Sequence, residues 1–267
     1  MKTYALFTLA FVLLVACAAP TPTPAPTATA VPAVYVYADI AMTNALRAVR
    51  EAFAKAHPEI RIEFSFVDAA NMPSRLDSSL SANLVLSANA LVFEQLAKQN
   101  RIETAPRVVT RNPLVVFIAR TNPAGIERIE DLTRGDLAFA IANEKTPLGQ
   151  ATRALVENMR HDLTFGPEFS QVVLDHVSAE SDDANSIFES VLLNHADVGI
   201  VYASDANLRL GRITLLDLPK GLDVTTDYSA AVLKSTHAPT QAQLFFDFVT
   251  SPPAQAIFAE YGFQANP

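Results

Sequence analysis

The stretch VYVYADIAMTNALRAVREAFAKAHPEIRIEFSFV, residues 34–67, decides the fold, because it reads as a strand, a helix and a second strand in succession. Its first four residues are β-branched or aromatic, which favours a strand. Residues 44–58 then predict a helix that Pro58 ends, with Leu46 and Phe53 on one face and Thr43 as its expected cap. Residues 60–67 then alternate apolar and polar side chains, as a half-buried strand does.

The same alternation of strands and helices continues to the C-terminus. The pattern predicts extended segments at 83–87, 114–119, 137–142, 172–177, 198–201, 212–216 and 229–233. It predicts helices at 73–80, 91–99, 183–194, 241–250 and 253–261, and a turn at 147–149 followed by a helix to about residue 160. Such alternation predicts parallel sheets covered by helices on both faces, which bind ligands beyond the carboxyl ends of their strands. Four loops are therefore candidate binding loops: Ala38–Met42, Asp68–Met72, Thr146–Gly149 and the segment at Tyr202.

The N-terminus predicts export and a lipid anchor. The apolar run at 5–15 has the length of a signal-peptide core and is too short to span a bilayer. It leads into an LVAC lipobox, so residues 1–17 are expected to be a lipoprotein signal peptide that ends at the lipidated Cys17. Cys17 is the only cysteine, which excludes an internal disulfide. Residues 18–33 contain only Ala, Pro, Thr and Val and predict an extended tether. An ordinary signal peptide with a chance cysteine is the alternative interpretation.

Composition argues against several classes of function. The formal net charge of −8 argues against a nucleic-acid-binding protein. There are only eight glycines, and neither GxGxxG nor GxxxxGK[ST] occurs. The enzyme motifs G-x-S-x-G, H-E-x-x-H and C-x-x-C do not occur either, and the five histidines are scattered. The sequence therefore predicts neither an enzyme nor a cofactor, and no side chains that bind a metal cation directly.

Motifs spread along the chain carry a resemblance to one family. They are YADIAMTNA at 37–45, AHP at 56–58, FSF at 64–66, ANLVLSAN at 82–89, RNPLV at 111–115, ADVGIVYASDA at 196–206 and the tail from Phe245 to Phe263. In this order and spacing they resemble the molybdate-binding proteins of ABC importers over almost all of Val34–Phe263. The resemblance implies a two-lobed α/β fold of the type II periplasmic-binding-protein kind, with parallel-rich sheets. It also implies that two crossing strands join the lobes and that the ligand cleft lies between them.

The order of these motifs predicts how the chain is divided. Lobe one is expected to contain residues 34–110 plus 227–267, and lobe two residues 111–226. The partners that the resemblance implies are an ABC permease in the membrane and a small oxyanion, molybdate or tungstate, in the cleft. Backbone N–H groups at turns and helix N-termini carry positive dipole density, so they hold such a dianion without a full countercharge.

The resemblance also identifies the positions that would contact the ligand. They are Ala41, Ala69, Leu148, Ala184 and Tyr202. Ala41 and Ala69 stand where the family has serine ligands, so two hydroxyl donors are missing. Leu148 and Ala184 are expected to contribute backbone amides, and Tyr202 keeps the side chain of the family.

Acidic residues appear where the family holds its anion. Asp39 and Asp68 lie in the first two candidate loops, together with Asn71, and Asp183 is expected to cap the helix that it begins. An ionised carboxylate accepts hydrogen bonds and donates none, and it repels a desolvated dianion. Asp39 and Asp68 either point to solvent or cap helices, or they change the ligand. Three interpretations of function thus stay open: a weak oxyanion importer, a binding protein for another neutral or cationic solute, and a homologue recruited to a surface role other than transport.

Overall fold

The computed structural model describes residues 33–79, 81–234 and 237–265. Every described residue belongs to one compact unit. The predicted signal peptide, Cys17 and nearly all of the predicted tether lie outside the described residues. In the described part of the chain, no helix is both long and apolar enough to cross a membrane.

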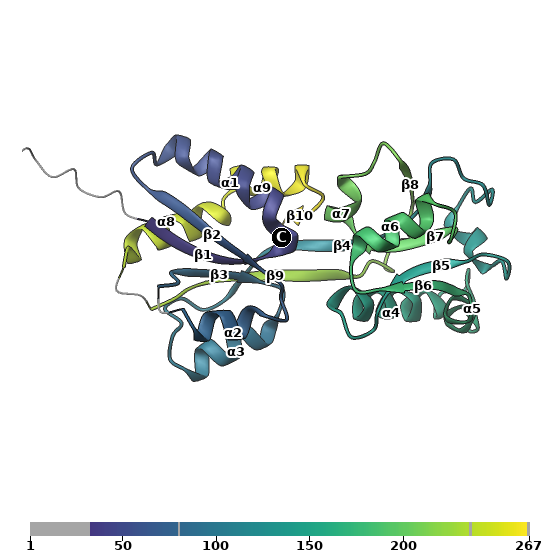
Figure 1. The fold of residues 1–267 in the computed structure, drawn as a ribbon, viewed down its shortest axis with the longest axis horizontal. Helices are drawn as coiled ribbons and strands as arrows, with labels where there is room; N and C mark the ends of the chain where they lie inside the picture. Colours follow the sequence, from purple (N-terminus) through teal and green to yellow (C-terminus); the bar gives the residue numbers. More distant parts are fainter. Residues whose placement is uncertain (1–32, 80, 235–236, 266–267) are drawn as a thin grey trace, which may run out of the picture. The chain divides into compact units, whose positions relative to one another are not determined.

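One half of the described fold, here called the terminal half, is built from both ends of the chain. In it, β1 (Ala33–Asp39) lies between its parallel neighbours β2 (Arg61–Val67) and β3 (Leu84–Ser87). One face of these strands carries α1 (Thr43–Ala56), α8 (Pro239–Val249) and α9 (Pro252–Glu260), and the other carries α2 (Met72–Asp77) and α3 (Ala90–Lys98) (Figure 1). The short helix η1 (Ile40–Met42) and the strand β10 (Gln264–Ala265) complete this half.

The other half, here called the middle half, comes from the centre of the sequence. Its strand β5 (Phe139–Ala142) lies between the parallel strands β6 (Val177–Ser181) and β7 (Val198–Tyr202). The remaining elements are η2 (Ile129–Thr133), α4 (Pro147–Arg160), α5 (Phe169–Asp175), α6 (Ala184–Leu192), α7 (Ala203–Asn207) and β8 (Ile213–Leu216). Helices α4 and α6 lie on opposite sides of the strands (Figure 1).

Two strands belong to both halves. Strand β4 (Arg107–Ala119) pairs antiparallel with β9 (Thr225–Val232) and β10 at its beginning, and with β7 and β8 at its end. Strand β9 in turn pairs antiparallel with β3, so the order along the sheet is β2-β1-β3-β9-β4-β7-β5-β6. The predicted parallel pairing is confirmed within each half, whereas the antiparallel pairs arise because β4 and β9 run between the halves.

Each half encloses its own hydrophobic core. The middle half buries Phe117, Phe139 and Phe188 in one cluster. The terminal half has a core on each face of its strands, with Phe53 and Phe245 in one and Met72 among the residues of the other. Full burial of one such side chain stabilises the fold by about 1.5–3 kcal/mol. The lobe boundaries themselves stay a prediction, because β4 and β9 contribute to both halves.

Three local predictions were wrong. Thr43 is not the helix cap but the first residue of α1, and its hydroxyl donates to the Ile40 carbonyl at 2.6 Å, because η1 already turns the chain ahead of α1. Residues 172–177 are not extended throughout, since α5 ends at Asp175 and buries Phe169 and Val173, four residues apart, on one helical face. Residues 147–149 form the first turn of α4 rather than a turn before it.

Candidate functional site

The carboxyl ends of the parallel strands lie side by side in each half. In the terminal half, Asp39 at the end of β1 is level with Val67 at the end of β2 and neighbours the end of β3. In the middle half, Ala142 and Ser181 are paired at the ends of β5 and β6. The candidate loops follow directly from these ends, where helix N-termini and turns expose backbone N–H groups.

Asp39 connects the loops of the terminal half. Its side chain is only 3% exposed, and its two oxygens accept hydrogen bonds from the Ser87 hydroxyl at 2.8 Å and the Ala88 amide at 2.7 Å. The Ser87 oxygen accepts in turn from the amide of Asn89, whose side-chain amide donates to the Ala69 carbonyl at 3.0 Å. Asp39 therefore neither points to solvent nor caps η1, so these two interpretations of its side chain were wrong, and the interpretation that it changes the ligand stays a prediction.

The Asp39 carboxyl group is held in an environment that disfavours its charge. Burial raises the pKa of Asp39 from 3.8 to about 6, although the hydrogen bonds from Ala88 and Ser87 act in the opposite direction. Repulsion from Asp68 adds to the increase. Burial raises the pKa of Tyr202 in the middle half, and the Asp39 charge adds to that increase.

Ala41 lines a small hollow of about 90 Å³ together with Thr43 and Asn44 at the start of α1. Ser204 and Asp205 of α7 line the same hollow, so residues of the two halves meet there. Burial raises the pKa of the Asp205 carboxyl group to about 6, against the opposing effect of Arg209. A second poorly solvated carboxylate thus accompanies Asp39, and the sequence analysis did not single it out.

The predicted site residues between β2 and α2 are more exposed to solvent than Asp39. Asp68 and Asn71 are exposed and line a shallow hollow with Arg75, while Ala69 is half-buried. The backbone carbonyl of Asp68 accepts a hydrogen bond from the Asn71 amide at 2.9 Å. The exposed position of Asp68 agrees with the prediction that its side chain points to solvent.

Leu148 occupies the second position of α4, where a helical N–H group has no acceptor within its own helix. Thr146 caps this helix, because its hydroxyl oxygen accepts from the Gly149 amide at 3.0 Å. The Leu148 side chain is 8% exposed and belongs to the core of the middle half. The Leu148 side chain is therefore accommodated in the core, and its backbone amide stays in the first turn of α4.

Ala184 is the first residue of α6 and directly follows the capping residue Asp183. The Asp183 carboxylate accepts from the Ser186 amide at 3.0 Å and from the Ser186 hydroxyl at 2.8 Å, which confirms the predicted cap. These bonds hold the pKa of Asp183 below its ordinary value. The cap leaves the Ala184 amide in the first turn of α6, where N–H groups have no helical acceptor.

Tyr202 ends β7 and is 7% exposed. Its hydroxyl group lies 2.9 Å from the hydroxyl group of Thr226 in β9, and burial raises the pKa of Tyr202. If Thr226 donates this hydrogen bond, the Tyr202 proton is available for a ligand. Next to it, the Asn112 side chain donates to the Ser204 hydroxyl oxygen at 2.9 Å and so connects β4 to α7.

The structure links some predicted residues directly and leaves others apart. The Asp39 network reaches Ala69, and Ala41 and Asp68 line separate hollows that share Ile40. Leu148 lies in the first turn of α4 and Ala184 in the first turn of α6, both in the middle half. The sequence did not identify Ser87 as a site residue. It lies in the ANLVLSAN motif at 82–89, and it and Ala88 donate the hydrogen bonds to Asp39.

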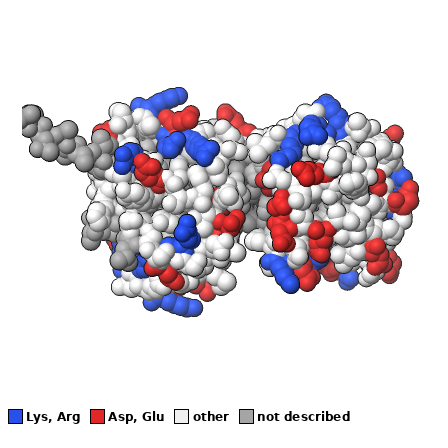
Figure 2. All heavy atoms as spheres, in the orientation of Figure 1, with Lys and Arg blue, Asp and Glu red and all other residues white. Residues whose placement is uncertain are grey.

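Charged side chains of both signs lie on the described surface. On the face drawn in Figure 2, Lys and Arg side chains are interspersed with Asp and Glu among the described residues, and they do not form a broad basic patch. Among the described residues, no group of three or more His, Cys, Asp or Glu side chains is arranged to hold a metal ion.

Two α/β halves that share two long strands, with helix N-termini at the strand ends of both, define the fold of a periplasmic solute-binding protein of type II. The chain belongs to the family of bacterial extracellular solute-binding proteins, whose pattern matches residues 34–264. The family consists of solute-binding proteins and not of enzymes. The protein is therefore the solute-binding component of a transport system and acts outside the cytoplasm.

Individual relatives agree with this assignment. The chain is 27% identical over 252 residues to the molybdate-binding protein ModA of Mycobacterium tuberculosis, covering 94% of this chain and 92% of the relative. It is 24% identical over 238 residues to ModA of Escherichia coli, covering 86% of this chain and 88% of the relative. The substrate-binding domain of a putative molybdenum ABC transporter from Clostridium difficile has the same fold, with a TM-score of 0.77 at 18% identity, over 88% of this chain and 99% of that domain.

Proposed function

We propose that this protein is the lipid-anchored substrate-binding component of an ABC importer, and that it binds a tetrahedral oxyanion of the molybdate and tungstate type. The observation that carries the proposal is the pair of helix N-termini in the middle half, where Leu148 and Ala184 contribute amides beside capping residues. The Tyr202 hydroxyl is the third donor. Three neutral donors of this kind suit a dianion, because oriented N–H groups stabilise negative charge without a countercharge.

Binding is expected to be weak for this class of protein. Ala41 and Ala69 have no hydroxyl group, and a hydrogen bond to a charged ligand contributes about 1.5–3 kcal/mol. Loss of both lowers the affinity on the order of a hundredfold or more. The buried Asp39 carboxylate opposes the ligand further, because it accepts hydrogen bonds from Ser87 and Ala88 and carries the same sign of charge.

The two halves serve as lobes in this proposal, with lobe one at 34–110 plus 227–267 and lobe two at 111–226. Rotation about β4 and β9 closes the cleft, because these strands alone run through both halves in the described sheet. Closure removes water and strengthens each hydrogen bond to the ligand. An ABC permease in the membrane is the partner that receives the ligand.

Calorimetric titration of the Val34–Pro267 body with molybdate tests the ligand class. The unmodified body is expected to bind weakly, and the double variant Ala41→Ser/Ala69→Ser is expected to gain at least about tenfold in affinity, since it restores two hydroxyl donors. Tight binding by the unmodified body contradicts the proposed loss of donors. No gain in the double variant contradicts the proposed location of the cleft.

The anchor is tested separately, in cells. A single acyl chain holds a protein only marginally at a membrane, whereas two or more hold it firmly. The variant Cys17→Ser is therefore expected to appear in the soluble fraction or to remain unprocessed, while Thr21→Ser in the tether leaves membrane retention unchanged. Normal processing and retention of Cys17→Ser rules out the lipid anchor.

A second candidate function is the binding of a neutral or cationic solute, and the carboxylates favour it. Asp39 and Asp205 are both poorly solvated and both act on Tyr202. A thermal-denaturation screen separates the candidates, because a ligand that binds only the folded protein raises its melting temperature. Stabilisation by divalent cations, sugars or amino acids, without stabilisation by molybdate or tungstate, favours this second function.

A further inference from the structure

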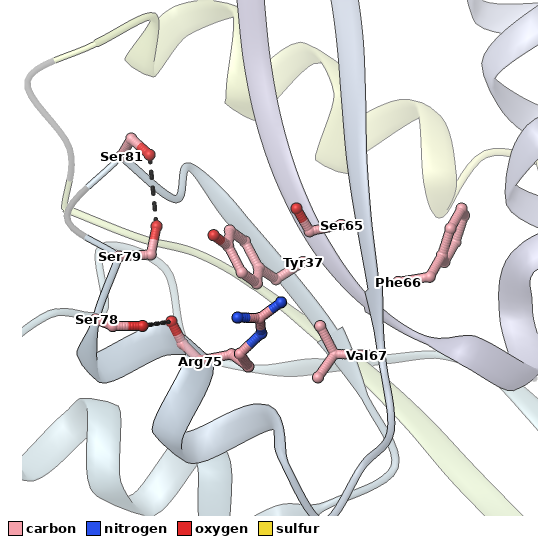
Figure 3. Close-up of a pocket in the computed structure, with 8 residues that line it drawn as sticks. All are labelled: Tyr37, Ser65, Phe66, Val67, Arg75, Ser78, Ser79 and Ser81. Carbon is pink, nitrogen blue, oxygen red and sulfur yellow. Dashed lines mark hydrogen bonds between the residues drawn. The ribbon is translucent and has the colours of Figure 1, made fainter.

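A second pocket lies in the terminal half, on the side of β1 and β2 next to α2 (Figure 3). Its volume is about 580 Å³, which is far larger than a bare tetrahedral ion requires. Tyr37 of β1, Ser65 and Val67 of β2, Arg75 of α2 and Ser79 line it. Further serine hydroxyls at its rim make the lining rich in hydrogen-bonding groups, and no described lining residue is acidic.

The pocket stays open because no helix covers this corner of the sheet. Strand β2 is the edge strand, and α2 has only six residues. Helix α2 buries Met72 and Leu76 in the core on this side of the sheet, to which α3 contributes Val92. The side chains of Tyr37 and Ser65 therefore border a hollow, while Tyr37 also packs in part against the core of α2 and α3 (Figure 3).

Three donor groups from three elements face this hollow without a partner. Within the described residues, the Arg75 guanidinium has no carboxylate within 4.0 Å and forms no side-chain hydrogen bond. The hydroxyl groups of Tyr37 and Ser65 have no hydrogen-bond partner among these residues either. Figure 3 shows the Arg75 side chain reaching from α2 toward the ring of Tyr37.

The wall that carries Arg75 is fixed before any ligand arrives. The Arg101 guanidinium donates to the carbonyls of Leu76 and Ser79, each at 2.8 Å. The Asp77 carboxylate accepts from the side chains of Gln95 and Gln99 of the following segment. These bonds hold the end of α2 in place, which lowers the ordering cost of binding.

We propose that this pocket is a second binding site, which takes a small phosphate ester with a hydroxylated body, such as a sugar phosphate. A guanidinium presents a planar fork of N–H donors that matches phosphate geometry, and two hydroxyl groups approach from other directions. Such an arrangement satisfies the three terminal oxygens of a phosphate monoester better than the two oxygens of a carboxylate. The remaining volume and the serine hydroxyls accommodate the body of the ester.

The site is distinct from the proposed oxyanion cleft but adjoins one of its loops. Arg75 also lines the shallow hollow that contains Asp68 and Asn71. Tyr202, in contrast, lies in the middle half. The proposal therefore does not depend on the oxyanion function, and a cleft variant separates the two sites.

Calorimetric titration of the exported protein with glucose 6-phosphate, inorganic phosphate and glucose tests the proposal. Glucose 6-phosphate is expected to bind, inorganic phosphate to bind more weakly, and glucose to give no signal. The variant Arg75→Gln is expected to weaken glucose 6-phosphate binding at least about tenfold, because it removes a charge-assisted bond. Tyr37→Phe is expected to weaken it by a smaller factor.

Matched controls exclude general effects of charge and of strand packing. Arg50→Gln removes a guanidinium from α1, and Tyr35→Phe removes a hydroxyl group from β1, two residues from Tyr37. Both variants are expected to bind glucose 6-phosphate as tightly as the unmodified protein does. Tyr202→Phe is expected to have no effect on this ligand. The proposal is overturned if the unmodified protein does not bind glucose 6-phosphate, if Arg75→Gln binds it equally well, or if inorganic phosphate binds as tightly as the ester.

Discussion

Asp39 makes the stability of the folded protein depend on pH in a direction unusual for an aspartate. Its pKa is raised to about 6 by burial, so the folded state binds this proton more tightly than the unfolded chain, whose carboxyl group titrates near 3.8. The stabilisation from Asp39 is therefore complete in acid and is lost as the pH rises from about 4 to about 6. Each unit of pKa difference corresponds to about 1.4 kcal/mol, so the loss is on the order of 2–3 kcal/mol.

The variant Asp39→Asn tests this pH dependence. In the unmodified protein, the free energy of unfolding is expected to fall between pH 4 and pH 7 because of both Asp39 and Asp205. In Asp39→Asn the fall is expected to be smaller, because only the contribution of Asp205 remains. Denaturant titrations at several pH values provide the measurement. The variant Asp223→Asn, which changes an exposed aspartate, is the control and should follow the unmodified protein. Parallel curves for Asp39→Asn and the unmodified protein would show that Asp39 titrates normally.

The Tyr202 hydroxyl is the second residue-scale test, because it is the only predicted side-chain donor that the chain retains. Tyr202→Phe is expected to lower oxyanion affinity by about tenfold to a hundredfold, as a bond to a charged ligand is lost. Thr226→Val removes the hydroxyl group that lies 2.9 Å from it and should have a smaller effect, since Tyr202 keeps its proton. Titration with tungstate compares both variants. Equal affinities for Tyr202→Phe and the unmodified protein would remove Tyr202 from the site.

Residues whose partners are close in sequence were predictable, and those with distant partners were not. The Asp183 cap follows from its position one residue before α6, and the Ser186 and Ser181 groups that donate to it lie within three residues in the sequence. The partners of Asp39 come 48 and 49 residues later, at the end of β3. No local pattern reports such a contact, so the sequence identified Asp39 as a candidate without identifying what holds it.

At the scale of elements, the first turn of α4 depends on Gly149. A Cβ atom at this position would lie 1.9 Å from the Asn143 carbonyl oxygen, in the turn that precedes the helix. Gly149→Ala is therefore expected to destabilise the protein by about 1–3 kcal/mol, even though alanine favours helices. Because the same turn presents the Leu148 amide, oxyanion affinity should fall with it. Thermal denaturation and titration measure the two effects.

Gly211→Ala is the matched control for this change. Nothing lies within 4 Å of a Cβ atom at Gly211, so the variant should stay within about 0.5 kcal/mol of the unmodified protein. If Gly149→Ala is equally neutral, the turn at Asn143 is free to move and does not fix the Leu148 amide.

The elements with a strong pattern were predicted well, and the misplaced ones have a physical explanation. Helix α1 and strand β2 lie within a residue or two of the predicted bounds, because each has one clearly apolar face. The segment at 172–177 contains two adjacent valines, which favour a strand locally. Burial of Phe169 and Val173 in the core of the middle half outweighs that preference and produces α5.

At the scale of the whole described fold, the sequence predicted the strand and helix order but not the pairing of β4 and β9. The parallel pairs follow from the alternation of strands and helices. The antiparallel pairs depend on which strand returns from the middle half, and β4 and β9 are too far apart in the sequence for a local pattern to report their pairing. The resemblance to a two-lobed family, and not the periodicity, predicted two strands that cross between halves.

The C-terminal segment of the terminal half contacts α7 of the middle half. Gly262 has a φ of +85°, and a Cβ atom there would lie 2.7 Å from the Ala203 carbonyl oxygen. Nearby, the Asn207 side chain donates to the Glu260 carbonyl at 2.9 Å. Because α7 directly follows Tyr202, a shift of this contact displaces the Tyr202 hydroxyl as well.

Gly262→Ala is therefore expected to act on both stability and ligand binding. The left-handed backbone costs an alanine about 1–2 kcal/mol, and the clash with Ala203 adds about 1–3 kcal/mol. Gly221→Ala is the control, because its φ of +92° carries the same backbone strain while nothing lies within 4 Å of the added Cβ atom. Thermal denaturation should show the larger loss for Gly262→Ala, and oxyanion titration should show weaker binding for that variant alone. Equal losses in the two variants would mean that backbone strain explains the effect and that the contact with α7 does not position Tyr202.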